Sequence, residues 1–217
     1  MRVDIWADLV CPWCYLGKRR FDNALAEFAH AGDVEVVHHS FQLDPSFPLG
    51  ETRDQREVLT EKYGMTAEQA AKSGLEMEER AAADGLEYNM TGMKMGNTVD
   101  AHQILHLGAK HGLADAVMER LYRAHFTEQR SIFTHDSLVE LAVEAGLDGA
   151  EARTVLESGT YAEEVAADGA EARALGASGV PFFVIDNRYG VSGAQPKEVF
   201  TQALTRAYSE STPTPAP

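Results

Sequence analysis

The beginning of the chain changes from a strand pattern to a helix pattern and back. Apolar and polar side chains alternate over residues 3–7, which predicts a β-strand. A helix follows, because apolar side chains recur at helical spacing up to Gly32, which should close it. These apolar positions are Leu16, Phe21, Leu25 and Phe28. Residues 34–43 are rich in β-branched and aromatic side chains and predict a second strand, parallel to the first through a right-handed crossover.

The middle of the chain has a helical pattern. Helices are expected over residues 56–63, 66–85, 97–111, 113–124, 137–145 and 160–175, with a further one opening at Asp148. Thr66, Asp148 and Thr160 each begin a segment with the spacing of a capping box. Residues 86–96 predict irregular structure. Because no fixed repeat period occurs, the region is not a solenoid.

Strand patterns return near the end of the chain. Residues 180–185 predict a strand, and residues 189–192 predict its antiparallel return after a turn. A final helix begins at Pro196. Without the middle region, the predicted elements form a four-stranded mixed sheet with flanking helices. Residues 211–217 alternate small and proline residues and predict a disordered tail.

Both cysteines of the chain lie where the first strand meets the first helix, in the sequence Cys11-Pro12-Trp13-Cys14. The first amides of a helix lack internal partners, and the helix dipole is positive there. A thiolate at Cys11 would therefore be stabilised and reactive. Cys14 lies one turn further on the same helix face, within reach for a disulfide. We expect Cys11 to attack a substrate and Cys14 to resolve the product.

Two other interpretations of the cysteine pair are a structural zinc site and a pair of structural thiols. A structural zinc site needs four ligands, and the chain has no second cysteine pair. Histidines could complete such a site, but His38 and His39 are adjacent on a predicted strand. Their side chains point to opposite faces, so at most one could serve. The second alternative, a pair of structural thiols, does not explain the position at the start of a helix.

The position of the cysteine pair predicts a redox domain. A CxxC motif at the end of the first strand of a βαβ unit is typical of thioredoxin-like proteins. The predicted fold class is α/β, namely a thioredoxin fold with a large all-α insertion after the second strand. The predicted domains are a thioredoxin-like domain of residues 1–44 and 160–210, and a helical insertion domain of residues 45–159.

Composition and charge exclude several classes of protein. The chain has 217 residues, 44% of them hydrophobic, which is enough for one sizeable core. Its net charge is −15, and its one basic cluster, Lys18-Arg19-Arg20, is expected on a solvated helix face. Nucleic acid and anionic membranes are therefore excluded as partners. No secretory signal or membrane span is expected, so we expect a cytoplasmic location, where paired cysteines are more often catalytic than structural.

Three stretches of the chain resemble the DsbA family of thioredoxin-fold proteins, and within it the cytosolic FrnE-like branch. The first is residues 8–14, which contain the CxxC motif, and the second is residues 97–102. The third is residues 179–185, followed by residues 191–196. This branch is related to the 2-hydroxychromene-2-carboxylate isomerases and the kappa-class glutathione transferases. The similarity extends over nearly the whole chain, short of the tail.

The resemblance implies further site residues. It implies a cis peptide bond before Pro181, facing the cysteine pair, which would leave the Val180 backbone free to pair with an extended substrate. Pro12 and Trp13 would contribute to the same substrate-contacting surface. His102 is similar to a position near the active site of the related isomerases, although a helix histidine is more often structural.

One position departs from the family pattern. Thioredoxins and DsbA place a buried acid six residues before the first cysteine, where this chain has Ile5. Asp8 is closer to the motif but at the wrong strand position. We therefore expect proton removal from Cys14 to depend on water or on the substrate.

The leading interpretation is a thiol–disulfide oxidoreductase or disulfide isomerase. It would act on a protein or small molecule that carries a thiol or disulfide, with no bound cofactor or metal and with glutathione as a redox partner. The alternative is a glutathione-dependent, non-redox isomerase or transferase, whose relatives use one hydroxyl or thiol at the first motif position. A third interpretation is a chaperone-like binding module with an apolar groove near residues 90–95. The relatives are also consistent with a homodimer.

Overall fold

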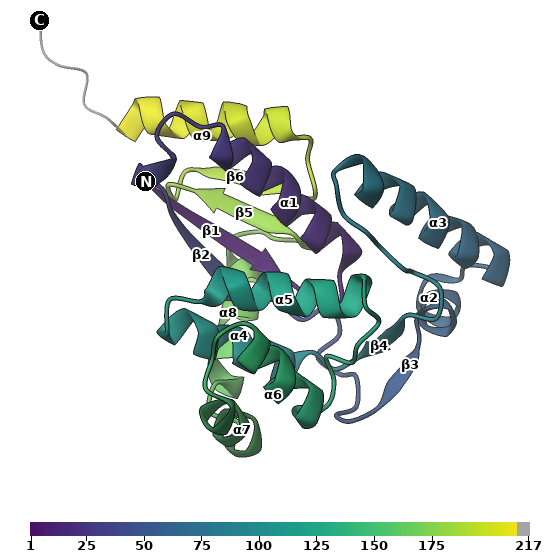
Figure 1. Cartoon of the computed structure of the whole chain (residues 1–217). Coiled ribbons are helices and arrows are strands. Elements are labelled where there is room, and N and C mark those ends of the chain that lie inside the picture. Colours follow the sequence, from purple (N-terminus) through teal and green to yellow (C-terminus); the bar gives the residue numbers. More distant parts are fainter. Residues whose placement is uncertain (212–217) are drawn as a thin grey trace, which may run out of the picture.

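Four strands form the central sheet of the chain, whose computed structural model describes residues 1–211 (Figure 1). They are β1 (Arg2–Ala7), β2 (Glu35–Ser40), β5 (Phe182–Ile185) and β6 (Tyr189–Ser192). Their spatial order is β2-β1-β5-β6. β1 runs parallel to β2, whereas β5 runs antiparallel to both β1 and β6. The predicted four-stranded mixed sheet is confirmed.

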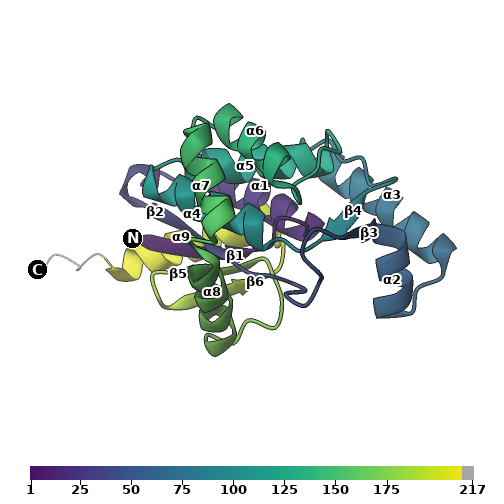
Figure 2. The same ribbon diagram turned by 90° about the horizontal axis from the view of Figure 1, so that it is seen from below.

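Helices cover both faces of this sheet, because successive strand side chains point to opposite sides. Val3, Ile5 and Phe183 pack in the cluster formed with α1 (Pro12–Ala26) and α9 (Lys197–Ser211). Trp6 and Phe182 face the opposite side, where α8 (Ala162–Ala174) lies below the strands in Figure 2. The loop after β1, which is an inner strand, leads into α1 at the carboxyl end of that strand.

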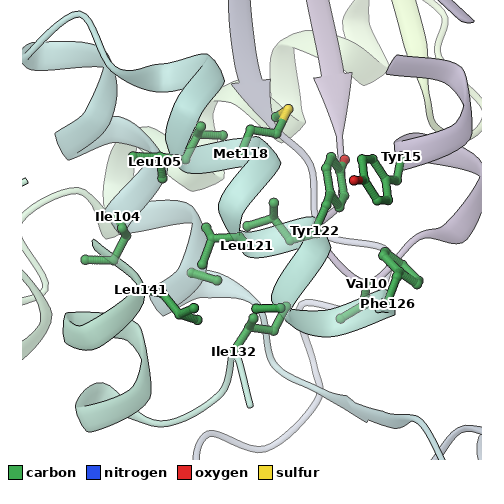
Figure 3. Packing of buried hydrophobic residues seen from close by; sticks show 14 of the residues in the cluster. Val10, Tyr15, Ile104, Leu105, Met118, Leu121, Tyr122, Phe126, Ile132 and Leu141 are labelled. Carbon is green, nitrogen blue, oxygen red and sulfur yellow. The ribbon is translucent and has the colours of Figure 1, made fainter. Parts of the chain in front are cut away.

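The predicted helical insertion lies between β2 and β5. Its helices are α2 (Gln55–Tyr63), α3 (Ala67–Ala83), α4 (Val99–Lys110), α5 (Ala114–Phe126), α6 (His135–Glu144) and α7 (Gly149–Ser158). The buried faces of α3 to α7 share one hydrophobic cluster with the loop after β1 and the first turns of α1. Figure 3 shows this contact, with Tyr122 of α5 beside Tyr15 of α1. The domain boundaries stated above stay a prediction, because this core crosses them.

The structure differs from the sequence interpretation at several element ends. Residues 94–96 are not irregular: β4 (Lys94–Gly96) pairs antiparallel with β3 (Thr52–Asp54), and strands this short show no alternation. α1 ends at Ala26 rather than at Gly32, and a 3₁₀ turn, η1 (Ala31–Asp33), follows.

Two of the three predicted helix caps are present. Thr66 forms the full capping box with Gln69, and the Asp148 side chain accepts a hydrogen bond from the Glu151 amide. Thr160 does not cap α8, since the residue before that helix is Tyr161. The Tyr161 amide instead donates to the Gln103 side chain at 3.1 Å. Tertiary contact with α4 therefore replaces the local cap.

The basic cluster on α1 is not the solvated face that the sequence predicts. The Lys18 side chain is 4% exposed, and its Nζ lies 2.7 Å from carboxylate oxygens of both Asp22 and Asp115. Asp115 comes from α5, so the lysine joins the first helix to the insertion. Its place on the buried side follows from α5 packing there, which the pattern of α1 alone does not show.

The end of the described chain is helical. Ser211 is the last residue of α9, so the predicted tail is wrong at its first position, and residues 212–217 lie outside the described residues. Within residues 1–211, every helix is too short or too polar to cross a bilayer.

Candidate active site

The cysteine pair lies at the start of α1, as predicted. Cys11 is the N-cap residue of that helix, with extended backbone angles, and Pro12 occupies its first turn. The Cys14 amide donates to the Cys11 carbonyl at 3.0 Å, so the motif closes as a helical turn. Both thiols are free, and they are 5% and 1% exposed, respectively. The more accessible sulfur therefore belongs to the residue at the positive end of the helix dipole.

The Cys11 thiol faces the loop before β5. Its Sγ lies 3.8 Å from the carbonyl oxygen of Val180, and the Val180–Pro181 peptide bond is cis. The segment that the resemblance implies is thus beside the first cysteine. Gly17 makes this approach sterically feasible, since a Cβ there would lie 2.7 Å from Cγ of Pro181.

Cys14 lies in a different environment from Cys11. Burial raises the pKa of the Cys14 thiol well above its ordinary value, and its hydrogen bond to Cys11 and the charges of Cys11 and Asp8 raise it further. A hydrogen bond from the Asp8 backbone opposes these effects. Cys14 is consequently a neutral thiol near pH 7. It must lose a proton before it can attack a disulfide.

Asp8 does not occupy the strand position that the family pattern uses, and its charge is one of the causes, after burial and the contacts with Cys11, that raise the pKa of Cys14. The residue is 1% exposed and lies just beyond β1. Its Oδ2 accepts a hydrogen bond from the Leu43 amide at 2.7 Å. Its Oδ1 lies 3.4 Å from His102 Nε2. The chain therefore places a buried carboxylate near Cys14 from the loop after the strand, whereas the family pattern uses the strand itself.

Two buried histidines extend this polar cluster. His102 is fully buried on α4, and its Nδ1 has no hydrogen-bond partner within residues 1–211. Its accessory role stays a prediction, since its Nε2 contacts Asp8 rather than a thiol. Sequence reasoning missed His125 of α5. Burial lowers the pKa of His125 to about 4, although the charge of Asp8 opposes this shift.

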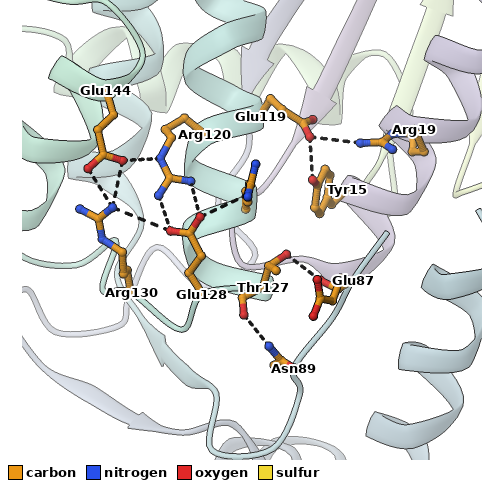
Figure 4. A network of polar contacts seen from close by, with 11 residues as sticks. Tyr15, Arg19, Glu87, Asn89, Glu119, Arg120, Thr127, Glu128, Arg130 and Glu144 are labelled. Carbon is orange, nitrogen blue, oxygen red and sulfur yellow. Dashed lines mark hydrogen bonds and ion pairs between the residues drawn. The ribbon is translucent and has the colours of Figure 1, made fainter. Parts of the chain in front are cut away.

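Aromatic residues of α1, α5 and the loop before β4 pack around the cysteine motif. The Tyr88 hydroxyl donates to the Pro12 carbonyl at 2.8 Å, and the Tyr15 ring stacks between Tyr88 and Tyr122. The Tyr15 hydroxyl donates to Glu119 of α5 at 2.7 Å, a contact drawn in Figure 4. The sequence interpretation missed these supports. The helical spacing of Tyr15 and Arg19 could have indicated a shared face, but Tyr88 lies in an irregular stretch.

An apolar cavity of about 470 Å³ opens beside Cys11. Trp13 and Pro12 form one wall, and the Trp13 side chain is 43% exposed. The opposite wall comes mainly from α2 and α3 and from the loop before β4, and includes Val58, Leu59, Met65, Met77, Met90 and Met95. Met90 and Met95 thus line the groove that the third interpretation requires, whereas Met93 is buried in the core. The cavity could accept an apolar group attached to a reacting sulfur.

The comparisons with known proteins agree with this geometry. Residues 2–205 match the family model described as the DSBA-like thioredoxin domain. The crystal structure of a probable DsbA oxidoreductase from Streptomyces coelicolor has 51% identity and a TM-score of 0.94, with 100% of this chain and 94% of the other covered. The uncharacterised protein YwbO of Bacillus subtilis is 28% identical over 94% of this chain and 96% of its own length.

A more distant structure shares the fold. The cytosolic disulfide reductase DsbM from Pseudomonas aeruginosa, solved with GSH, has 20% identity and a TM-score of 0.67, with 96% of this chain and 100% of the other covered. At this identity the likeness concerns the fold alone. The family model extends over both the sheet and the helical insertion. The chain therefore belongs to the DsbA-like thioredoxin domain family of oxidoreductases.

Proposed function

We propose that the chain is a dithiol–disulfide oxidoreductase in which Cys11 is the nucleophile and Cys14 is the resolving thiol. The observation that carries this proposal is the contrast between the two sulfurs. Cys11 is the N-cap residue of α1 and lines the apolar cavity, whereas Cys14 lies in the next turn and is buried, which raises its pKa. A substrate can reach the first sulfur and not the second.

The exchange proceeds in two steps. The Cys11 thiolate attacks one sulfur of a substrate disulfide, forms a mixed disulfide and releases the first substrate thiolate, which takes up a proton. Cys14 then loses its proton and attacks the Cys11 sulfur, which releases the second substrate thiol. The substrate gains two electrons and two protons, and Cys11 and Cys14 become a disulfide. The reverse sequence oxidises a substrate dithiol.

The substrate contacts follow from the residues around Cys11. Trp13 and Pro12 provide an apolar wall for groups next to the reacting sulfur. The Val180 backbone, beside the Cys11 thiol, would pair with an extended substrate segment. Pro181 has no amide hydrogen and so cannot donate to the thiolate. These contacts suit either a cysteine-bearing peptide or a small apolar disulfide.

We propose glutathione as the redox partner and the cytoplasm as the compartment. The fold neighbour DsbM is a cytosolic disulfide reductase whose structure was solved with GSH. Glutathione would reduce the Cys11–Cys14 disulfide through a mixed disulfide at Cys11. No cofactor is needed for this cycle, because the electrons pass directly between sulfurs.

Single-cysteine variants test the assigned roles. Cys11→Ser should abolish reduction of oxidised glutathione and of an aromatic disulfide, because Cys11 supplies the thiol that lines the cavity. Cys14→Ser should accumulate the mixed disulfide at Cys11, which intact-protein mass spectrometry detects. Full exchange activity in Cys11→Ser would contradict the proposal.

The glutathione-dependent isomerase or transferase remains the second candidate, favoured by the apolar cavity next to one thiol. Such chemistry needs Cys11 alone. Glutathione binding and turnover of an aromatic substrate that survive Cys14→Ser, without disulfide exchange in the intact chain, would favour this candidate.

A further inference from the structure

A cluster of histidine and carboxylate side chains lies on the sheet face opposite α1. His39 projects from β2 toward α8, where Asp168 and Glu171 occupy one helix face. The nearest ligand atoms of His39, Asp168 and Glu171 all lie within 4.8 Å of one another. His106 of α4 completes the group, with its Nε2 3.2 Å from Asp168 Oδ2 and 3.1 Å from Ser40 Oγ.

His39 has a carboxylate at each ring nitrogen. Its Nε2 lies 2.7 Å from Asp4 Oδ1, and its Nδ1 lies 3.3 Å from Asp168 Oδ1. A neutral imidazole has a single N–H, which the shorter contact assigns to Nε2. The second ring nitrogen, Nδ1, faces the Asp168 carboxylate, so a positive charge is favoured between them, either a proton on Nδ1 or a metal ion that replaces this proton. The Asp4 carboxylate is also paired with Arg2, whose Nε lies 2.9 and 3.0 Å from its two oxygens.

The arrangement around His39 has the features of a metal site. Ligating histidines commonly donate their second ring N–H to a carboxylate, as His39 does to Asp4. Asp168 is held in place by the Ser40 amide, which donates to Oδ2 at 2.8 Å. Glu171 is exposed, and its carboxylate makes no hydrogen bond or ion pair with any described residue. It is therefore available to close over an ion that enters from solvent.

We propose that His39, Asp168 and Glu171 bind a divalent transition-metal ion such as Zn²⁺, with His106 as the fourth ligand. Imidazole and carboxylate together suit Zn²⁺, Co²⁺ and Ni²⁺. Ligands bound at about 2.1 Å to a tetrahedral ion lie roughly 3.4 Å apart, so the exposed Glu171 side chain turns inward on binding. The ion would link α8 to β2 and α4, on the face of the sheet away from the thiols.

Calorimetric titration with Zn²⁺ tests the site. The full chain carrying Cys11→Ser and Cys14→Ser is used, so that the thiols do not bind the metal. We expect one Zn²⁺ per chain, at least tenfold weaker binding in Glu171→Gln, and loss of binding in His39→Gln. The exposed Glu171 carboxylate makes no hydrogen bond or close ion pair within residues 1–211, so we expect its variant to fold normally even where His39→Gln does not. Glu151→Gln is the matched control, since Glu151 pairs with the exposed His111 at 2.8 Å.

Fluorescence gives an independent readout. The Trp6 ring stacks on His39 with a centroid distance of 4.5 Å, so Co²⁺ at the site should quench Trp6 emission. Adding Trp13→Phe to the double serine variant leaves Trp6 as the single tryptophan. The proposal is overturned by absence of Zn²⁺ binding, by equal affinity in Glu171→Gln and the control, or by unchanged Trp6 emission with Co²⁺.

Discussion

The Cys11 thiol lies 3.8 Å from the carbonyl oxygen of Val180, a residue 169 positions further along the chain. β5 pairs with β1 and thereby brings the loop before β5 next to the start of α1. The reactive thiol therefore faces backbone from a segment that is distant in sequence but lies at the same end of the sheet. This contact depends on close packing between α1 and Pro181, which suggests the first test.

Gly17→Ala should disturb the site without changing its chemistry. The added Cβ would lie 2.7 Å from Cγ of Pro181 and 3.4 Å from Cα of Ala194, so one of these segments must move. We expect a loss of about 1–3 kcal/mol in the free energy of unfolding and slower disulfide exchange. Urea denaturation and exchange kinetics measure the two effects.

Gly169→Ala is the matched control for that variant. Gly169 is also helical, but its nearest neighbour is the flexible Arg173 guanidinium at 3.5 Å. Alanine there should be neutral or should stabilise by up to about 1 kcal/mol through helix propensity. Equal behaviour of the two variants would show that the approach of Pro181 does not constrain α1.

Asp8→Asn should make Cys14 easier to ionise. The Asp8 charge is one of the causes that raise the pKa of Cys14, after burial and the contacts with Cys11. Removing that charge should shift the pH dependence of Cys14 alkylation to lower pH, measured in the Cys11→Ser background. Asp44→Asn, which removes a carboxylate from the cavity rim, should leave the profile unchanged. A shift to higher pH in Asp8→Asn would contradict this account.

His125 should make stability depend on pH in mildly acidic solution. Burial lowers its pKa from 6.5 to about 4, so its neutral form stabilises the fold above pH 6.5. That stability is lost as the pH falls from 6.5 to 4, with a total of roughly 3 kcal/mol. Asp115 and Asp168, whose pKa values are lowered, lose their contributions only below their ordinary value of 3.8.

Urea denaturation between pH 4 and 7 checks this prediction. His125→Gln should flatten the dependence in that window, while His111→Gln, which changes a histidine with an exposed ring, should preserve it. The same slope in all three proteins would show that His125 ionises as easily in the folded chain as in the unfolded one.

Lys18→Met should weaken the contact between α1 and α5. The variant leaves Asp22 and Asp115 without the buried ammonium group that pairs with both. Since both carboxylates remain partly hydrated, we expect a loss of about 1–2 kcal/mol in unfolding free energy, less than for a fully buried pair. Lys110→Met removes a lysine from an exposed pair with Glu151 and should lower the unfolding free energy much less than Lys18→Met does, because solvent screens an exposed pair. Equal losses would refute the assigned role of Lys18.

The sheet and the cysteine pair were predictable because their signals are local. Alternation in β1, the apolar run of β5 and the spacing of Cys11 and Cys14 each depend on a few neighbouring residues. Capping boxes were also predictable where local hydrogen bonds decide the cap, as at Thr66. At Thr160 the predicted cap is absent, and the neighbouring Tyr161 amide donates to the Gln103 side chain on another helix.

The rest of the site depends on contacts between distant segments. The sequence around Lys18 predicts a surface residue, because the contact that buries it comes from Asp115 on α5. The position of Asp8 in the sequence does not show that its carboxylate accepts a hydrogen bond from the Leu43 amide or that its charge acts on Cys14. Gly17 carried a usable signal, because it lies one turn after Cys14 on the same helix face. The sequence alone does not show that Pro181 packs there.

The most direct test of the proposed function is a redox titration of the chain in glutathione buffers. Emission of Trp13, which lies inside the motif, would report the state of the pair, and alkylation would count free thiols. We predict one reversible two-electron transition that involves both Cys11 and Cys14 and disappears in either serine variant. Absence of a transition at any accessible ratio of reduced to oxidised glutathione would contradict the account.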